Sequence, residues 1–446
     1  MASDVVSNET TASSDGARPQ KGGSVMRKVI VLGTLALLCS VLVAGAQAGK
    51  QATVVKLRFA TYVWQPTTVA ANKSIVDSWN KSHPGIQVEV VPVDVNSVHD
   101  KLLTSFVGGT AADIIHDEAA DIAGFTQQGY LANLTPLIPK SLKASIPKDI
   151  WATTNFGGKI TGVPSLMQTY NIFANMDILK SAGIKAPTLS NPWTWAQFRA
   201  NAKKLTTSSR YGVCWGLRSP TAVTQTMSLN YGGQFFYLEN GKWTFKFGPN
   251  DQNVVKQMHD MIHVDKSVDP AATGLSGSAV LPAFFGGKCA MTVAGNFTAQ
   301  SMILQGPKDF NWAMFPLLKG QSQQQVANPQ TYSISAQSTN KQSAMFFLAY
   351  LVNKQNLAKL AAGDWLIPSN PEAGKLLRKS TKRAGSWKIA TESVVHFRKG
   401  NWVSLAAYPR WKAEVAQPAF VQYLRGQTTL DELGKSLSDG WTRVRG

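Results

Sequence analysis

Carboxylates and histidines are the residues of this chain from which a catalytic or metal site could be built. His259 and His263 stand four residues apart, so a helix would place both imidazoles on one face, where they could bind a metal ion. Asp117 and Glu118 could supply half of the carboxylate pair that hydrolyses a glycosidic bond. Neither set is complete, because no third metal ligand in a matching motif and no second carboxylate motif accompanies them. We therefore expect the two histidines to lie on a solvated helix face.

The motifs of the common enzyme classes are also missing. The sequence has no Gly-x-Ser-x-Gly elbow, no His-Glu-x-x-His zinc motif and no glycine-rich phosphate loop. We expect a protein that is not an enzyme and that uses neither a metal ion nor another cofactor. A secreted glycoside hydrolase stays open as an alternative, because the distance between carboxylates cannot be read from a sequence.

Strand and helix patterns alternate over the first hundred residues that follow the N-terminal apolar run. Residues 54–60, 86–91 and 112–115 have strand patterns, and residues 68–80 and 98–107 have helical ones. This order is typical of an α/β lobe with a largely parallel sheet. In such sheets ligands bind at the carboxyl ends of the strands, where Trp64 and Asp117 fall in this sequence.

The stretch 157–179 has the pattern of a connection between two lobes. Paired glycines at 157 and 158 suit a tight turn, and Pro164 interrupts an extended run. A second extended run follows over 168–174, and a helical pattern opens near Met176. An ordinary strand–bend–strand inside one domain would give the same pattern. The length of 446 residues favours two lobes, because a chain of this size seldom builds one core.

The N-terminal segment has the pattern of an export signal. Met26-Arg27-Lys28 precedes the apolar run 29–44, and Ala46-Gln47-Ala48 follows as a cleavage site. We assign residues 1–48 to an N-terminal extension and a signal peptide. The alternative is an uncleaved anchor, as in a membrane-tethered sensory ectodomain. Leu38 precedes Cys39 where a lipoprotein signal has a small residue, so we do not expect lipidation.

The chain is basic, with a formal net charge of +19. The basic residues are dispersed and belong to no nucleic-acid-binding module, so we expect no nucleic acid partner. For an exported protein the anionic cell envelope is a candidate partner, and a generally solvated basic face is the other interpretation. Cys214 and Cys289 both lie in strand-like runs, and the sequence leaves open whether they form a disulfide or stay as buried thiols.

An ordered series of motifs resembles the extracellular solute-binding proteins of ABC importers. The likeness is greatest to the branch that binds sugars, which includes maltose-binding protein. Gly-Lys-Ile-Thr-Gly-Val-Pro at 158–164, for example, is similar to the family's interlobe crossing. The motifs that carry the resemblance lie at 78–89, 101–103, 108–109, 112–115, 129–134, 158–164, 175–184, 193–198, 232–242, 284–297, 339–352 and 426–433. Each is weak alone, but together they run in order through residues 53–445.

The resemblance implies a fold and a function. The fold would be α/β and periplasmic-binding-protein-like, with two hinge-linked lobes and a ligand cleft between them. Lobe 1 would comprise 53–165 plus 290–335, and lobe 2 would comprise 166–289 plus 336–446. The protein would be a periplasmic or extracellular monomer that captures a mono- or oligosaccharide and delivers it to the transmembrane permease of an ABC transporter. Glycerol phosphoesters and polyamines are the alternative solutes.

The resemblance also implies which residues bind the ligand. Aromatic rings can stack on the C–H face of a sugar, and planar polar groups can bind its hydroxyls in pairs. The candidates are Tyr62, Trp64, Asp117 and Glu118 in the first lobe, Gln168 and Tyr170 at the crossing, Trp215 and Tyr231 in the second lobe, Asn296 and Phe297 at the return crossing, and Arg410 and Trp411 in the last cleft loop. Two have other natural roles, because Trp215 could pack in a core and Asp117 could cap a helix.

Overall fold

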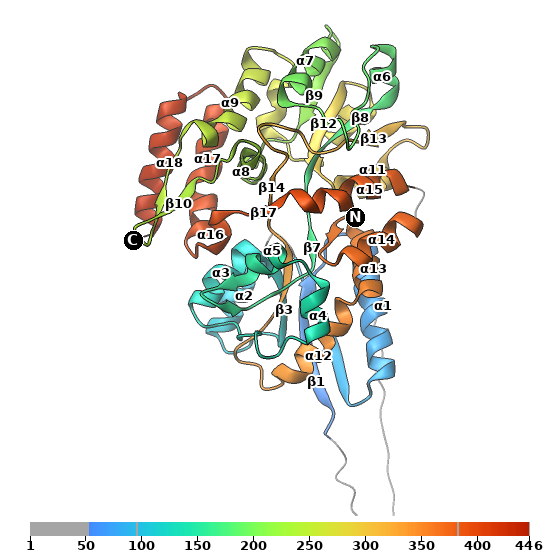
Figure 1. The fold of residues 1–446 in the computed structure, drawn as a ribbon, viewed down its shortest axis with the longest axis vertical. Helices are drawn as coiled ribbons and strands as arrows, with labels where there is room; N and C mark the ends of the chain where they lie inside the picture. Colours follow the sequence, from blue (N-terminus) through green and yellow to red (C-terminus); the bar gives the residue numbers. More distant parts are fainter. Residues whose placement is uncertain (1–52, 95–96, 381–382, 446) are drawn as a thin grey trace, which may run out of the picture. The chain divides into compact units, whose positions relative to one another are not determined.

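Two β-sheets, each flanked by helices, organise the chain (Figure 1). The structure, a computed structural model, describes residues 53–94, 97–380 and 383–445. The predicted signal segment 1–48 lies outside the described residues. Within the described part of the chain, no helix combines the length and the apolar character needed to cross a membrane.

The first sheet has the largely parallel order that the sequence predicts. Its strands run β2-β1-β3-β15-β6 across the sheet. Strands β1, β2 and β3 are parallel, and β15 and β6 add an antiparallel edge. The bounds are β1 (Val55–Tyr62), β2 (Ile86–Val93), β3 (Ile114–Glu118), β6 (Val163–Pro164) and β15 (Gln330–Ile334).

Alternation along β1 explains why both faces of this sheet are covered. Leu57 and Phe59 point into the core that also contains Trp79 of α1 (Pro66–Ser82). Ala60 and Tyr62 join the smaller core that contains Phe106 of α2 (Val98–Val107). Helices α3 (Ala119–Gln127), α4 (Lys140–Ser145) and α5 (Lys148–Trp151) and the hairpin β4 (Asn155–Phe156) and β5 (Lys159–Ile160) complete this part of the chain.

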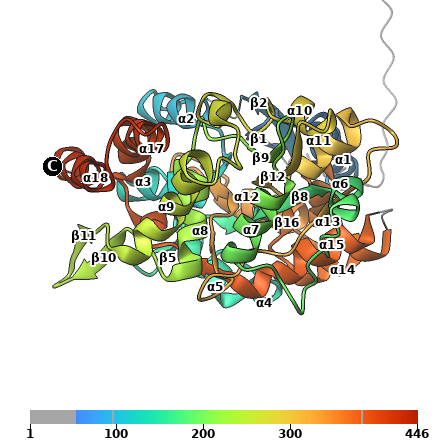
Figure 2. The same ribbon diagram turned by 90° about the horizontal axis from the view of Figure 1, so that it is seen from above.

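The second sheet has the order β13-β8-β12-β9. Strand β12 runs parallel to β9 and antiparallel to β8. The bounds are β8 (Tyr170–Asn175), β9 (Tyr211–Trp215), β12 (Cys289–Gly295) and β13 (Trp312–Met314). Its neighbouring helices are α6 (Met176–Ser181), α7 (Trp195–Leu205), α8 (Thr221–Ser228), α9 (Pro249–His263), α10 (Leu281–Phe285) and α11 (Thr298–Gln305). The hairpin β10 (Phe236–Glu239) and β11 (Lys242–Phe245) projects beside them (Figure 2).

The chain passes from one sheet to the other within 163–175, as the sequence predicts. Strand β6 pairs with β15 in the first sheet, and β8 pairs with β12 in the second. Between them β7 (Leu166–Met167) pairs with β16 (Ile367–Pro368), which belongs to a later crossing. A further crossing runs from β13 through β14 (Gln325–Ala327) to β15. These crossings lie together because β7, β15 and β16 are neighbours.

The pairing of the strands supports lobe limits that differ from the expected ones in the middle of the chain. Strands β12 and β13 belong to the second sheet, although they fall within 290–335. Helices α12 (Lys341–Leu351) and α13 (Lys354–Asp364) pack against β15 and α1 beside the first sheet. We therefore propose a first lobe of 53–165 plus about 328–365, and a second lobe formed by the remaining described residues.

The C-terminal part of the chain is helical and ends on the second sheet's core. It contains α14 (Pro371–Ser380), α15 (Ala384–Glu392), β17 (Phe397–Lys399), α16 (Tyr408–Trp411), α17 (Gln417–Leu424) and α18 (Leu430–Arg445). The core of the second sheet includes three buried rings from this part of the chain, those of Trp411, Phe420 and Trp441. A π-helical turn, Lys412–Ala416, separates α16 from α17.

Cys214 and Cys289 form a disulfide, which resolves the question that the sequence left open. The bond joins the neighbouring strands β9 and β12, and the two Cα atoms lie 5.5 Å apart. Both side chains are buried, and Val280 packs against them. The disulfide therefore ties together two strands of one sheet.

Helices α1 and α13 approach closely at a glycine and a buried carboxyl group. A Cβ on Gly363 would lie 2.8 Å from the Thr68 hydroxyl oxygen and 3.0 Å from its backbone nitrogen, so a larger residue there would push the two helices apart. The next residue, Asp364, is 3% exposed and accepts a hydrogen bond from the Thr68 hydroxyl. Burial raises the pKa of Asp364 to about 7, although the hydrogen bond from Thr68 opposes this shift.

We predict that Asp364→Asn abolishes the loss of folding stability that the wild-type protein undergoes as pH rises from about 4 to about 7. The folded state holds the Asp364 proton up to about pH 7, whereas the unfolded chain releases it near pH 4, so wild-type stability falls over this window as pH rises. The variant should gain roughly 2 to 4 kcal/mol over the wild type at pH 8 and little at pH 4. Urea unfolding at both pH values measures this difference, with Asp439→Asn on the exposed face of α18 as the control. A difference that stays constant with pH would contradict the prediction.

Candidate functional site

A cavity of about 250 Å³ lies where the first sheet meets the crossings between the sheets. Its wall combines the ends of β1 and β3 with β7 and the segments that enter β15 and β16. The lining residues are Tyr62, Trp64, Glu118, Leu166, Met167, Gln168, Asn328, Gln330 and Leu366. The cavity is thus formed by segments that lie far apart in the sequence, from Tyr62 to Leu366.

Aromatic rings form one side of this cavity. Tyr62 ends β1, and Trp64 lies in the loop between β1 and α1. The indole of Trp64 is 37% exposed, which is unusual for so large an apolar group. Phe297 meets it edge-on, with ring centroids 5.3 Å apart. An exposed ring held by a second ring offers a flat apolar face to a ligand.

Amide and carboxyl groups form the other side. The Asn328 Nδ2 donates to Glu118 Oε2 at 2.7 Å, and its Oδ1 accepts from the backbone nitrogen of Ala120 at 3.0 Å. The Gln330 Oε1 lies 3.2 Å from the Nε2 of His116, within hydrogen-bonding distance. Gln168 follows β7 and is partly exposed. These groups can exchange several hydrogen bonds with a polyhydroxylated ligand.

A buried carboxyl lies directly behind Tyr62. Asp117 is 1% exposed, and its Oδ1 accepts from the Tyr62 hydroxyl at 3.3 Å and from the Glu118 backbone nitrogen at 2.9 Å. Its Oδ2 lies 3.8 Å from the Nδ1 of His99, beyond hydrogen-bonding distance. Helix α3 begins after Glu118 without a side-chain cap, so capping is not the role of Asp117. The residue instead positions Tyr62.

Burial determines the titration of these two acids. Desolvation raises the pKa of Asp117 to about 6 and that of Glu118 to about 7. The carboxyl of Asp121 adds to the rise at Glu118, and the ammonium of Lys412 opposes it. For Lys412 burial lowers the pKa, but the carboxyls of Asp121, Glu118 and Asp117 together raise it above its usual value. The acids of the first lobe thus face a lysine of the second.

The structure brings seven of the twelve candidate residues to this region. Tyr62, Trp64, Glu118 and Gln168 line the cavity, Phe297 touches Trp64, and Asp117 supports Tyr62. Tyr170 is the seventh of these residues. Burial is the main cause of its raised pKa, and the charge of Glu118 adds to the rise, so this half-buried tyrosine lies near the Glu118 carboxyl.

Asn296 is near but has a structural role. It is fully buried, accepts from the Thr169 backbone nitrogen at 2.9 Å and donates to the carbonyl of Trp365. It therefore joins the end of β12 to two crossings.

Four candidates lie away from the cavity. Trp215 is 1% exposed and packs against Phe198 in the second core. Trp411 is fully buried, and its Nε1 donates to the carbonyl of Leu437 at 3.0 Å. The Arg410 side chain is exposed and pairs with Glu414 one turn further along. The Tyr231 hydroxyl accepts from Gln257 at 2.9 Å. Core packing and local pairing occupy these side chains, so their contact with a ligand stays a prediction.

Asn328 and Gln330 line the cavity but were not among the candidates. They come from the crossing that leads into β15, some two hundred residues after Glu118 in the chain. The only sequence signal is an Asn-Pro pair ahead of a strand, which is common in turns.

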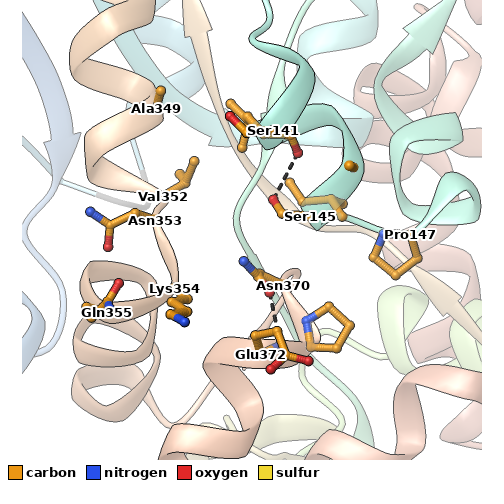
Figure 3. A pocket seen from close by; sticks show the side chains of 14 residues that line it. Ser141, Ser145, Pro147, Ala349, Val352, Asn353, Lys354, Gln355, Asn370 and Glu372 are labelled. Atoms are coloured by element: carbon orange, nitrogen blue, oxygen red, sulfur yellow. Dashed lines mark hydrogen bonds between the residues drawn. The ribbon is translucent and has the colours of Figure 1, made fainter.

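A larger cavity, of about 560 Å³, lies among α4, the junction of α12 and α13, and the start of α14 (Figure 3). Its wall includes Ser141, Ser145, Asn353 and Asn370 but no aromatic side chain. The Glu372 backbone nitrogen donates to the Asn370 Oδ1 at 2.9 Å, so this amide oxygen already has a partner. We therefore place the candidate site at the smaller cavity, where exposed aromatic and polar groups meet.

The family model described as "Bacterial extracellular solute-binding protein" matches residues 64–358. The chain belongs to this family. A relative from Streptomyces antibioticus, "Uncharacterized lipoprotein in oleD 5'region", is 40% identical to this solute-binding protein over 92% of the chain and 91% of the relative. The "Arabinooligosaccharide-binding protein" of Bacillus subtilis strain 168 is 29% identical over 45% of this chain and 46% of that protein.

Solved structures show the same fold. An ABC substrate-binding protein of Listeria monocytogenes in complex with cycloalternan has a TM-score of 0.72 at 20% identity, covering 88% of this chain and 98% of that one. The sugar-binding protein MalE of Xanthomonas citri has a TM-score of 0.75 at 19% identity, covering 88% and 96%. The solute-binding protein therefore has the predicted two-lobed, periplasmic-binding-protein-like α/β fold.

The prediction of an exported protein is confirmed by the family, which is extracellular. Cys39 and the apolar run 29–44 lie outside the described residues, so the absence of lipidation stays a prediction. Among the described residues no group of three metal-ligating side chains is found, and His259 and His263 lie on α9 with ring centroids 4.5 Å apart.

We predict that Asn296→Ala destabilises the protein by about 2 to 4 kcal/mol, because a buried backbone donor and a buried carbonyl each lose their partner. Chemical denaturation measures the loss. The control is Asn311→Ala, which removes an exposed hydrogen bond to Asp177 and should cost less than about 0.5 kcal/mol. Equal effects of the two substitutions would show that Asn296 does not join the crossings.

Proposed function

We propose that this protein is the substrate-binding component of an ABC transporter and that it captures a carbohydrate between its lobes. The observation that carries the proposal is the cavity at the crossings, in which the exposed indole of Trp64 faces amide and carboxyl groups. The names of relatives support the ligand class, since they include an arabinooligosaccharide-binding and a galactooligosaccharide-binding protein of Bacillus subtilis. We further propose that the protein acts by binding alone, without catalysis.

The size of the cavity suits one sugar ring. Its volume of about 250 Å³ falls below the roughly 300–1,000 Å³ that is usual for ligand pockets. A longer saccharide would extend from the cavity past Trp64, whose ring lies at the edge and is partly exposed. Stacking on Trp64 and hydrogen bonds to Gln168, Asn328 and Gln330 would hold the ring from two sides.

The composition of the cavity wall weighs against one alternative solute. A phosphoester needs cationic side chains or helix N-termini around its phosphate. No lysine, arginine or histidine is among the described residues that line the cavity. A polyamine stays a second candidate, because Glu118 offers the carboxylate that an ammonium group binds.

Closure of the lobes would transmit binding to a partner. A ligand that contacts both lobes stabilises the closed arrangement by its differential affinity for it. The crossings at β7 and β16 are the segments that would bend, and Met167 and Leu366 of these segments line the cavity. We propose that the closed monomer delivers the carbohydrate to the transmembrane permease, and that its basic surface favours the anionic cell envelope.

We predict that one class of saccharide raises the melting temperature of residues 49–446, since a ligand that binds only the folded state adds about 2.7 kcal/mol at a hundredfold excess over its Kd. Thermal shift against mono- and oligosaccharides, polyamines and phosphoesters is the measurement. Trp64→Ala should abolish the shift with little effect on the unliganded melting temperature, because the ring is partly exposed.

The matched control is Trp243→Ala on the hairpin β10–β11, which lies outside the cavity and should leave the shift intact. A shift only with phosphoesters or polyamines would contradict the carbohydrate assignment and preserve the solute-binding fold. A shift that survives in Trp64→Ala would move the site elsewhere.

A further inference from the structure

We infer that the cavity selects a saccharide that carries a protonated amine, with Glu118 as the residue that determines this specificity. The inference rests on the proposed function, since it names the substrate class of the same cavity. It follows from the charge of Glu118, from the hydrogen bond that Glu118 accepts, and from the charged and polar groups around the cavity.

Glu118 is the one charged side chain among the described residues that line the cavity. Its Oε2 accepts from Asn328, so one carboxylate oxygen is held in place by a neutral donor. No ion pair to Glu118 within 4.0 Å is found in the described part of the chain. A carboxylate with a neutral partner is the group that a ligand ammonium binds by a charge-assisted hydrogen bond.

The surroundings of Glu118 reinforce this preference. Asp117 is buried behind Tyr62, and its Oδ2 has no hydrogen-bond partner. Burial is the largest cause of the raised pKa of Glu118, and the carboxyl of Asp121 in α3 is the next. A like charge therefore lies near Glu118. Lys412 of the π-helical turn is the one opposing charge from the second lobe that acts on Glu118. The carboxyls of Asp117, Glu118 and Asp121 outnumber the opposing groups, which are the Lys412 ammonium and the His99 imidazole 3.8 Å from Asp117. The site therefore favours a positive ligand charge over a negative one.

The wall residues other than Glu118 explain why the ligand would be a sugar and not a simple amine. Trp64, held by Phe297, supplies a flat indole on which the C–H face of a pyranose ring can stack. Gln168 and Gln330 supply planar amides for neighbouring hydroxyls. The combination of one carboxylate, two amides and an exposed indole fits an amino sugar ring better than a polyamine chain.

The experiment compares three versions of one ring with the purified protein: glucose, glucosamine and glucuronic acid, and likewise galactose, galactosamine and galacturonic acid. Isothermal titration measures each Kd at pH 7.5. We expect the amine of at least one series to bind about tenfold more tightly than its neutral form, as one charge-assisted hydrogen bond would give, and the acid to bind most weakly.

Glu118→Gln keeps the hydrogen-bonding shape and removes the charge. It should reduce the affinity for the amine more than that for the neutral sugar, so that the two forms of the ring bind about equally. Glu239→Gln on the hairpin β10–β11 is the control and should change none of the affinities. A thermal melt establishes that each variant is folded.

The outcomes separate the two claims. Neutral sugars that bind as tightly as the amines, or an amine preference that survives in Glu118→Gln, would overturn the inference and leave the proposed function standing. Binding of spermidine or of glycerol 3-phosphate with no binding of any sugar in the screen would overturn both. An amine preference that depends on Glu118 would establish the substrate class.

Discussion

The fold depends on one constraint, which is that the chain must pass between its two sheets at a single place. Strands β7 and β16 pair at this place, and β6 and β15 pair beside them. Asn296, which follows the second-sheet strand β12, links two of these crossings. Its side chain accepts a hydrogen bond from the Thr169 backbone nitrogen and donates one to the Trp365 carbonyl. The crossing segments are short and buried, so they offer few positions at which the lobes can rotate. In the proposed function, a ligand bound against them would lie where the lobes pivot.

The same constraint explains the cavity and the raised pKa values of Asp117 and Glu118. Parallel strands β1 and β3 end at the crossings, so Tyr62 and Glu118 meet Met167 and Leu366 there. Water is largely excluded at this junction, and exclusion of water is what raises the pKa of Asp117 and Glu118. The protein retains two destabilising carboxyl groups at the point where its lobes join. In the proposed function, a ligand with hydrogen-bond donors would offset part of this cost.

The sequence predicts the local elements of the fold better than it predicts the site. Alternation over β1 and the buried run of β3 indicate the parallel sheet, and the glycine and proline pattern at 157–164 indicates the crossing. Trp64 could be chosen because a proline-bounded loop seldom buries an indole. Trp215 and Trp411 are buried instead, by Phe198 and by α18, and these contacts arise only from tertiary packing. Asn328 and Gln330 reach Glu118 only through the folded topology, which no local pattern encodes.

The two lobes also contact each other through α3. Ala119 and Ala120 open α3 in the first lobe, yet both are buried in the core of the second with Tyr408. Gly124, one turn further, lies close enough to the carbonyl of Ala406 that a Cβ would be 3.6 Å away. Small residues on α3 therefore let the two lobes pack closely against each other. In the proposed function, a ligand between the lobes would add to this contact, and it would favour the closed state only by as much as its affinity differs between the two states.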